Sequence, residues 1–243
     1  LYMIRFFVAP QDLTAPVHTL TGENAKHAKV LRLKQNEQVL LCDGQGREAL
    51  CTVRDSDSLT LSLGECRPSA SEARVCVSVY MAFPKADKLE HVIQKATELG
   101  AGEIVAFPSA RCVSKPDEKS LRKKLERWQK IAASASEQSG RGRIPEILVL
   151  GSYSEALERA RTADKAILFY EHEDTVTLRS ALESGTYRSI SLMTGPEGGL
   201  EEREVAQALD AGLTVCTLGK RILRCETAPL CALSAVMYAA GEY

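Results

Sequence analysis

The first 66 residues alternate hydrophobic and polar positions with a period of two, which is typical of strands that bury one face. The hydrophobic runs and the turns between them follow in the order 39–41, Asp43-Gly44, 49–53, 55–58, and then Leu59, Leu61 and Leu63. One helix is expected over residues 23–31. The pattern predicts a small β-barrel.

A polar segment at residues 67–73, rich in small side chains and containing Pro68, ends this alternation. Segments of this composition are typical of domain boundaries. We therefore predict two domains, residues 1–70 and residues 71–243.

Beyond the boundary, short hydrophobic runs alternate with amphipathic segments, as in a βαβ protein. Strands are expected at residues 75–81, 104–107, 147–150, 166–170, 190–193 and 214–218. Helices are expected at residues 87–99, 119–139, 153–161 and 178–182, around Val205, and around Leu233. The predicted fold of the second domain is α/β with a mainly parallel sheet.

Two neighbouring strand ends of this domain lead into glycine loops. The first loop is Thr194-Gly195-Pro196-Glu197-Gly198-Gly199, and the second begins with Leu218-Gly219-Lys220-Arg221. Ligands of open α/β sheets bind at the carboxyl ends of the strands, so the two loops are expected to line one site.

Neither loop has the spacing of a dinucleotide-binding motif or a P-loop, and Glu197 would repel a phosphate. A neutral or cationic ligand fits better. A lone glycine cluster is more often only a tight turn, but here a second cluster follows, with Arg221, Arg224 and Glu226 packed within six residues. Together the two clusters favour a binding site.

Composition excludes several classes of protein. Of the 243 residues, 44% are hydrophobic, which is ample for a buried core, and the formal net charge is −1. Any affinity for nucleic acid must therefore come from local basic patches. The eight cysteines form no C-x-x-C pair, and no histidine cluster accompanies them, so no metal site is expected.

Cysteine usage and hydropathy also bear on the compartment. Reduced thiols in a cytoplasm are the simplest explanation of the cysteines. A secretory signal peptide is not expected, because the apolar run at residues 4–8 is short and Pro10 ends it. No apolar run approaches membrane-spanning length, so no contact with a membrane is expected.

The two glycine loops resemble the C-terminal signature of a known family, the RsmE family. The resemblance rests on Gly195-Pro196-Glu197-Gly198-Gly199, residues 218–228 (LGKRILRCETA), residues 94–100 (QKATELG), residues 136–141 (SEQSGR) with Ile144-Pro145, and His27 with residues 30–32 (VLR). Members are 16S ribosomal RNA uridine-N3 methyltransferases of the SPOUT, or trefoil-knot, superfamily. Cys225 departs from the threonine usual in the family, and residues 133–136 depart from its usual Glu-Ala-Ala.

The resemblance implies a PUA-like β-barrel followed by an α/β-knot domain whose two glycine loops form the knot that binds S-adenosylmethionine (SAM). A homodimer is also implied, because a partner subunit completes the cofactor site in this superfamily. The expected cofactor-binding residues are Glu171, Thr194, Gly195, Glu197, Gly198, Gly199, Leu218, Gly219, Ile222 and Leu223.

Methylation of uridine N3 requires a sulfonium donor in line with the nitrogen, loss of a weakly acidic proton, and stabilisation of charge on O2 and O4, but no metal. N3 lies on the Watson–Crick edge, so the base must be unpaired or extruded. Arginine is well shaped to stabilise a uridinate, so Arg141 and Arg224 are the candidates for that role.

Glu197 and Glu226 are the candidate bases, and each would need a raised pKa or an acidified substrate. Direct proton loss to water is the other option.

Each catalytic candidate also has a structural interpretation. Arg141 would be a solvent-facing side chain at the end of the 119–139 helix, and Arg224 would form a salt bridge with Glu226 at the start of a helix. Glu226 would equally serve as a first-turn acid that favours the helix N-terminus. Glu171 would equally lie in a plain surface loop.

RNA contacts are expected from Arg5, Lys26, His27, Arg32, Lys88, Lys95 and Arg111. A solvated helix face is the commoner reason for a basic run such as the one around His27, but the family resemblance favours RNA. The expected substrate is small-subunit ribosomal RNA within the 30S particle. Two alternatives remain: a SPOUT ribose 2′-O methyltransferase, and a non-catalytic PUA-like RNA-binding or ribosome assembly factor.

Overall fold

The structure is a computed structural model that describes residues 3–113, 117–183 and 185–243. It divides into two compact units. The first contains the described residues up to Glu72 together with Ser136–Ile144, and the second contains those of Ala73–Ala135 and Pro145–Tyr243. The break after Glu72 lies two residues beyond the predicted boundary. Ser136–Ile144, which the sequence pattern assigns to the second domain, belongs to the first unit by its contacts.

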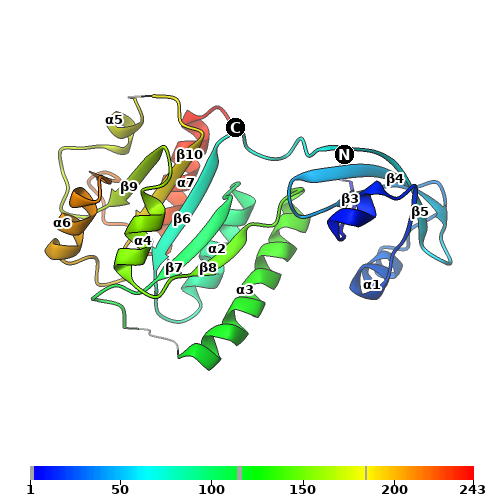
Figure 1. Cartoon of the computed structure of the whole chain (residues 1–243), viewed down its shortest axis with the longest axis horizontal. Coiled ribbons are helices and arrows are strands. Elements are labelled where there is room, and N and C mark those ends of the chain that lie inside the picture. The colour runs from blue at the N-terminus through cyan, green and yellow to red at the C-terminus, as the bar shows by residue number, and fades with distance from the viewer. Residues whose placement is uncertain (1–2, 114–116, 184) are drawn as a thin grey trace. The chain divides into compact units, whose positions relative to one another are not determined.

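The first unit is built on a five-stranded sheet with the order β1-β3-β4-β5-β2 (Figure 1). Its elements are β1 (Arg5–Phe7), the 3-10 helix η1 (Pro10–Thr14), β2 (Val17–Thr19), α1 (Gly22–Val30), β3 (Gln38–Cys42), β4 (Arg47–Asp55) and β5 (Thr60–Pro68). β1 runs parallel to β3, and the other neighbours are antiparallel. Within the described residues the short edge strands β1 and β2 do not pair with each other. The predicted barrel is therefore a PUA-like half-barrel.

The alternating hydrophobic positions form the core of this unit. Ala49, Cys51 and Val53 of β4 are fully buried and pack with the inward residues of the other strands. Register shifts between β4 and β5 interrupt the ladder and allow these long strands to bend around the core. α1 contributes only Ala28 to the buried set, which agrees with its polar sequence.

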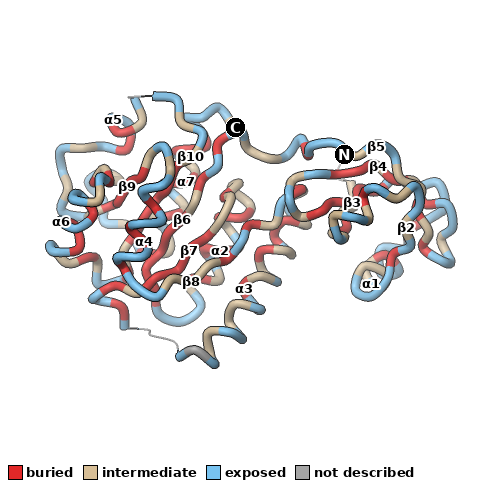
Figure 2. Tube along the Cα trace, viewed as in Figure 1, coloured by how far each residue is buried: buried red, intermediate tan, exposed pale blue. Residues whose placement is uncertain are grey.

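The second unit contains a six-stranded sheet with the order β11-β9-β10-β6-β7-β8 (Figure 1). The strands are β6 (Cys76–Ala82), β7 (Glu103–Phe107), β8 (Glu146–Val149), β9 (Lys165–Phe169), β10 (Ser189–Thr194) and β11 (Thr214–Cys216). All neighbouring pairs are parallel. Parallel sheets are covered on both faces, which explains why residues 104–107 are buried without alternation (Figure 2).

Helices connect the parallel strands. They are α2 (Lys88–Glu98), α3 (Glu118–Ser139), α4 (Tyr153–Ala160), α5 (Leu178–Leu182), α6 (Glu202–Asp210) and α7 (Thr227–Ala239). α2 packs beside α7, and α4 packs against β6, β7 and β10. α2 buries Leu89, Val92 and Ile93 on one face, and Gly100 follows its end with a φ of +96°, as expected for a helix C-cap. The predicted order of strands and helices is confirmed.

The carboxyl ends of parallel strands lie at one edge of their sheet. The loops that follow β6, β7, β9, β10 and β11 therefore gather at the same edge. Both glycine loops belong to this set.

Candidate functional site

The loop after β10 is held tightly at this edge. Thr194, the last residue of the strand, is buried, and its Oγ1 donates a hydrogen bond to the carbonyl of Tyr80 at 3.3 Å. Gly199 has a φ of +68°, and a Cβ at this position would collide with the carboxylate of Glu171. Glycine is therefore required at position 199 by its own backbone and by the neighbouring loop.

The loop after β9 lies beside both glycine loops. Glu171 contacts Gly199 of the first loop. The backbone N–H of Thr217, where the second loop begins, donates to the carbonyl of Val176 at 2.8 Å. Three loops from separate parts of the sequence thus meet. Glu171 lies where a third wall of the site would be, and its contact with the cofactor stays a prediction.

The loop after β11 is more open. Gly219 has a φ of +101°, and a Cβ there would meet no atom within 4 Å. Ile222 is 87% exposed, and Leu218 and Leu223 are half-buried. A ligand could therefore approach the backbone of this loop closely at Gly219.

Lys88, in the first turn of α2, joins the two glycine loops. Its Nζ lies 3.0 Å from Oε1 of Glu197 and 3.2 Å from Oε2 of Glu226. Sγ of Cys225 lies 3.7 Å from the same nitrogen and donates to Oε2 of Glu226 at 3.2 Å. Glu197 also accepts the backbone N–H of Lys85 at 2.9 Å. One ammonium and two carboxylates leave the cluster with a formal charge of −1, which suits a cationic ligand.

Both carboxylates of this cluster are held in the ionised form. Burial raises the pKa of Glu197, but the hydrogen bonds from the Lys85 backbone and from Lys88 outweigh it and lower the pKa to about 2. Hydrogen bonds from its own backbone N–H and from Cys225 lower the pKa of Glu226. Burial raises the pKa of the Cys225 thiol to about 12, so the thiol stays a neutral donor. Neither carboxylate has the raised pKa that a general base for uridine N3 would need.

Arg224 has an exposed side chain, with no hydrogen bond or ion pair to another side chain of the described residues. The structural interpretation that pairs it with Glu226 is wrong, because Glu226 pairs with Lys88. Arg224 precedes α7 on the same loop as Gly219, so its guanidinium is available to a ligand at this edge.

Arg141 belongs to the first unit and is only 4% exposed. Its Nη2 donates to Oε2 of Glu72 at 2.7 Å, and Oε1 of Glu72 accepts the backbone N–H groups of Gly142 at 2.9 Å and Arg143 at 3.0 Å. The interpretation of Arg141 as a solvent-facing side chain is therefore wrong. Its catalytic role stays a prediction.

Two of the predicted RNA contacts lie at the carboxyl edge and are engaged within the protein. Nη1 of Arg111 donates to the carbonyl of Gly198 at 2.9 Å, and Lys88 forms the ion pairs with Glu197 and Glu226. These two side chains hold the glycine loops in place.

The other predicted RNA contacts do not gather at that edge. Lys95 pairs with Glu98 and Lys26 with Glu23, each one helical turn apart. In the first unit, Arg5 pairs with the buried Glu48 at 3.1 Å, and Nδ1 of His27 lies 2.9 Å from Oε1 of Glu137. Arg32 is exposed.

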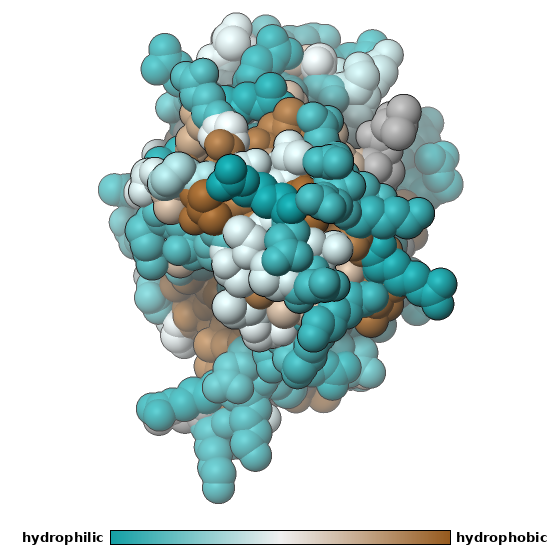
Figure 3. Space-filling model, turned by 90° about the vertical axis from the view of Figure 1, so that its right-hand side faces the viewer, coloured by the Kyte–Doolittle hydropathy of each residue, from teal (hydrophilic) through white to brown (hydrophobic). Residues whose placement is uncertain are grey.

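The face drawn in Figure 3 is mainly hydrophilic, with hydrophobic residues in small separate groups. It therefore presents polar groups and no broad apolar patch.

Sequence reasoning missed the positions of Lys88 and Glu72. Lys88 lies more than 100 residues before its partners in the glycine loops, and Glu72 lies 69 residues before Arg141. No local signal connects such pairs. In the sequence, Lys88 is one of several basic residues, and Glu72 is part of the polar segment between the two predicted domains.

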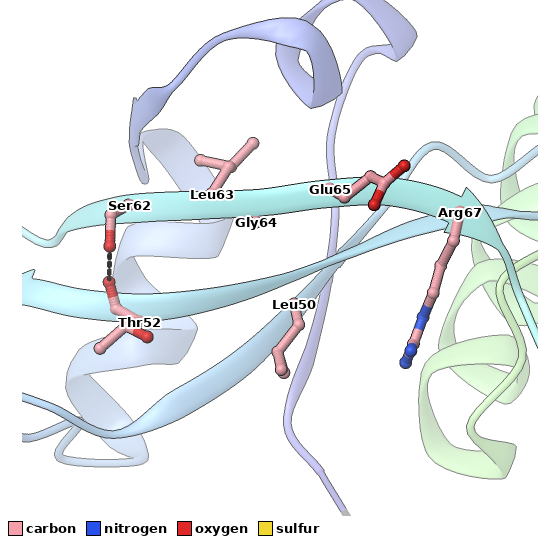
Figure 4. A pocket seen from close by; sticks show the side chains of 7 residues that line it. All are labelled: Leu50, Thr52, Ser62, Leu63, Gly64, Glu65 and Arg67. Carbon is pink, nitrogen blue, oxygen red and sulfur yellow. Dashed lines mark hydrogen bonds between the residues drawn. The ribbon is translucent and has the colours of Figure 1, made fainter.

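A hollow of about 460 Å³ lies on the first unit and is lined by residues of β4 and β5. Oγ of Ser62 donates to the carbonyl of Thr52 at 3.3 Å beside it. The side chains of Glu65 and Arg67 point in different directions (Figure 4). Without converging polar groups, this hollow is a weaker candidate than the loop cluster.

Two classes of site receive no support from the described residues. None of their His, Cys, Asp and Glu side chains form a group of three or more that could hold a metal ion. Among the same residues, no helix combines the length and the apolar character needed to cross a membrane.

Known proteins resemble this chain along most of its length. Residues 71–237 match the model of the RNA methyltransferase domain, and residues 20–64 match that of the RNA methyltransferase PUA domain. The chain is 38% identical to the ribosomal RNA small subunit methyltransferase E of Bacillus subtilis, over 97% of the chain and 96% of that relative. It is 35% identical to the protein of the same name from Mycobacterium bovis, over 95% and 90% of the two chains.

A solved structure carries the same name. The ribosomal RNA small subunit methyltransferase E of Neisseria gonorrhoeae, bound to S-adenosyl methionine, superposes with a TM-score of 0.82 at 31% identity and 98% coverage of each chain. The predicted combination of a PUA-like first domain and a SPOUT α/β domain is confirmed.

Proposed function

Because this chain belongs to the RsmE family of ribosomal RNA small subunit methyltransferases, we propose that it methylates N3 of one uridine in small-subunit ribosomal RNA. The chain is a SAM-dependent ribosomal RNA methyltransferase. What we propose is the acceptor of the methyl group, which is N3 of a uridine. The observation that carries the proposal is the meeting of three loops at the carboxyl edge of the sheet.

The residues at this edge fit SAM. A Cβ at Gly219 would meet only open space, and the cluster of Lys88, Glu197 and Glu226 carries a net negative charge, which attracts a sulfonium. Gly195, Gly198, Leu218 and the neighbouring backbone would hold the cofactor. When bound, SAM supplies the methyl group.

The protein supplies electrostatic stabilisation. Arg224 is exposed on the second glycine loop and would donate hydrogen bonds to O2 or O4 of the uridinate. Arg141 belongs to the first unit and stays a candidate for this role from the family resemblance alone. Glu197 and Glu226 are weak bases because their pKa values are lowered, so the N3 proton would leave to water once Arg224 has acidified the uracil.

The proposal also includes the substrate, the oligomeric state and the cellular location. The relatives are named as methyltransferases of small-subunit ribosomal RNA, which supports this RNA as the substrate, and we propose that it is methylated within the 30S particle. The family resemblance supports a homodimer in which a partner subunit completes the site. A ribosomal RNA substrate supports a cytoplasmic location.

The test is to incubate the protein and SAM with small subunits that lack the modification, and to identify the methylated nucleoside by mass spectrometry. We expect N3-methyluridine. The variant Arg224→Ala should lose most product while it still binds SAM, and Lys220→Ala, an exposed change in the same loop, is the control. A ribose-methylated nucleoside would refute the acceptor assignment. The absence of product on particles and on naked RNA, without SAM binding, would favour an RNA-binding factor.

A further inference from the structure

Lys88 is fixed by the core of the second unit and not by the glycine loops that it contacts. The next residue, Leu89, is 3% exposed, and Val92 and Ile93 one turn later are fully buried. The first turn of α2 is therefore anchored to the sheet. The side chain of Lys88 leaves this anchor and is 29% exposed.

The ammonium of Lys88 reaches two loops that are separate in sequence. Glu197 belongs to the loop after β10, and Glu226 is the residue before α7. Both carboxylates lie within 3.2 Å of one nitrogen, with side chains 25% and 27% exposed. Partly buried pairs of this kind are screened less by salt than surface pairs are.

We propose that Lys88 is a positioning residue that couples the two glycine loops and thereby sets the affinity for SAM. The inference rests on the proposed function, because it takes these loops to be the cofactor site. It replaces the prediction from sequence that Lys88 binds RNA.

Two arguments favour coupling over RNA contact. A phosphate could reach Lys88 only by displacing two carboxylates that already bind it. Removal of the ammonium would also leave two like charges close together on different loops, where they would repel each other. Glu197 would keep its hydrogen bonds from the Lys85 backbone and from its own backbone, but neither of these connects it to the loop of Glu226, so the two loops would separate.

The first experiment measures SAM binding to the full chain by calorimetry. We expect Lys88→Met to weaken binding at least about tenfold, and Lys88→Arg, which keeps the charge and both contacts, to restore most of the affinity. The control is Arg127→Met, which breaks an exposed ion pair of 2.6 Å between Arg127 of α3 and Glu90 of α2, the helix that carries Lys88. It should leave SAM binding unchanged.

The second measurement separates positioning from general stability. In methyl transfer to small subunits, Lys88→Met should raise the KM for SAM and leave the KM for the RNA substrate unchanged. Adding Glu226→Gln to Lys88→Met removes the repulsion, so the double variant should regain part of the lost affinity for SAM.

The outcomes are distinguishable. If the unchanged protein does not bind SAM, the proposed function fails and this inference falls with it. If the unchanged protein binds SAM and Lys88→Met binds it equally well, only the inference is overturned. A weaker salt dependence of RNA binding in Lys88→Met, with normal SAM affinity, would return Lys88 to the set of RNA contacts.

Discussion

Gly199 combines a φ of +68° with the carboxylate of Glu171 at the position that a Cβ would take. We predict that Gly199→Ala destabilises the protein by about 1–2 kcal/mol through backbone strain and also weakens SAM binding, because the Glu171 carboxylate must move. The control is Gly212→Ala, at φ +86° with nothing near its Cβ. It should show the strain in thermal unfolding and bind SAM normally, and equal SAM affinity in both variants would contradict the steric argument.

Glu197 gives a prediction about pH. Its pKa is about 2 in the folded protein, below the ordinary value, so its stabilising effect is full above about pH 4.5 and is lost as the pH falls toward 2. We expect Glu197→Gln to lower the free energy of unfolding by roughly 1 kcal/mol at pH 7, a value discounted for solvent screening. Urea unfolding should show this difference unchanged between pH 6 and 8 and smaller at pH 3.5. A difference that grows toward acid would show that Glu197 is not held ionised.

At the scale of elements, one segment joins a unit far from it in sequence. Residues Ser136–Ile144 follow the body of α3 but belong to the first unit, because Glu72 accepts hydrogen bonds from Arg141, Gly142 and Arg143. The backbone N–H of Ile144 also donates to the carbonyl of Gly44 at 2.9 Å. Glu72 and the backbone around Gly44 therefore both hold this segment.

We predict that Glu72→Gln loosens this segment, at a cost of about 1.5–3 kcal/mol, because charge-assisted hydrogen bonds are lost. Hydrogen exchange should show faster exchange of the amides of Gly142 and Arg143. If Arg141 is catalytic, methyl transfer should fall while SAM affinity stays unchanged. Glu65→Gln, an exposed change in the same unit, is the control, and unchanged exchange in Glu72→Gln would contradict the role of Glu72.

At the scale of the whole molecule, a formal net charge of −1 gives no general attraction to RNA. Binding must depend on a few exposed cations, and Arg32 is one of them. We predict that Arg32→Gln weakens binding of small-subunit RNA and reduces the salt slope of the affinity by about one. Lys123→Gln, an exposed change on α3, serves as a control for the loss of one exposed charge outside the glycine loops. An unchanged salt slope in Arg32→Gln would remove this residue from the RNA contacts.

Much of the fold was predictable because it depends on local patterns. Alternation along β4 and the uninterrupted run at residues 104–107 follow from burial on one face or on two faces of a sheet. The closure of the first sheet was not predictable in this way. β1 and β2 are three-residue edge strands, and whether such strands meet depends on the bending of the longer strands between them.

The candidate site was predictable only in part. The glycine loops are contiguous in sequence, and Gly199 and Gly219 adopt the positive φ for which glycine is suited. Arg224 and Glu226 were named as candidates for the same reason. The alternative that pairs them with each other does not hold, because Glu226 pairs with Lys88 from a helix that begins after a different strand.

The order of strands and helices, the glycine loops at two strand ends and, through the motifs, the family all follow from the amino-acid sequence. These properties depend on residues that are close together along the chain. The contacts of Lys88 with the two loops, the ion pair of Glu72 with Arg141, and the lowered pKa values of Glu197 and Glu226 become visible in the folded chain. Ion pairs and pKa values depend on distances of a few ångströms between side chains, and for residues far apart in sequence only the folded chain sets those distances.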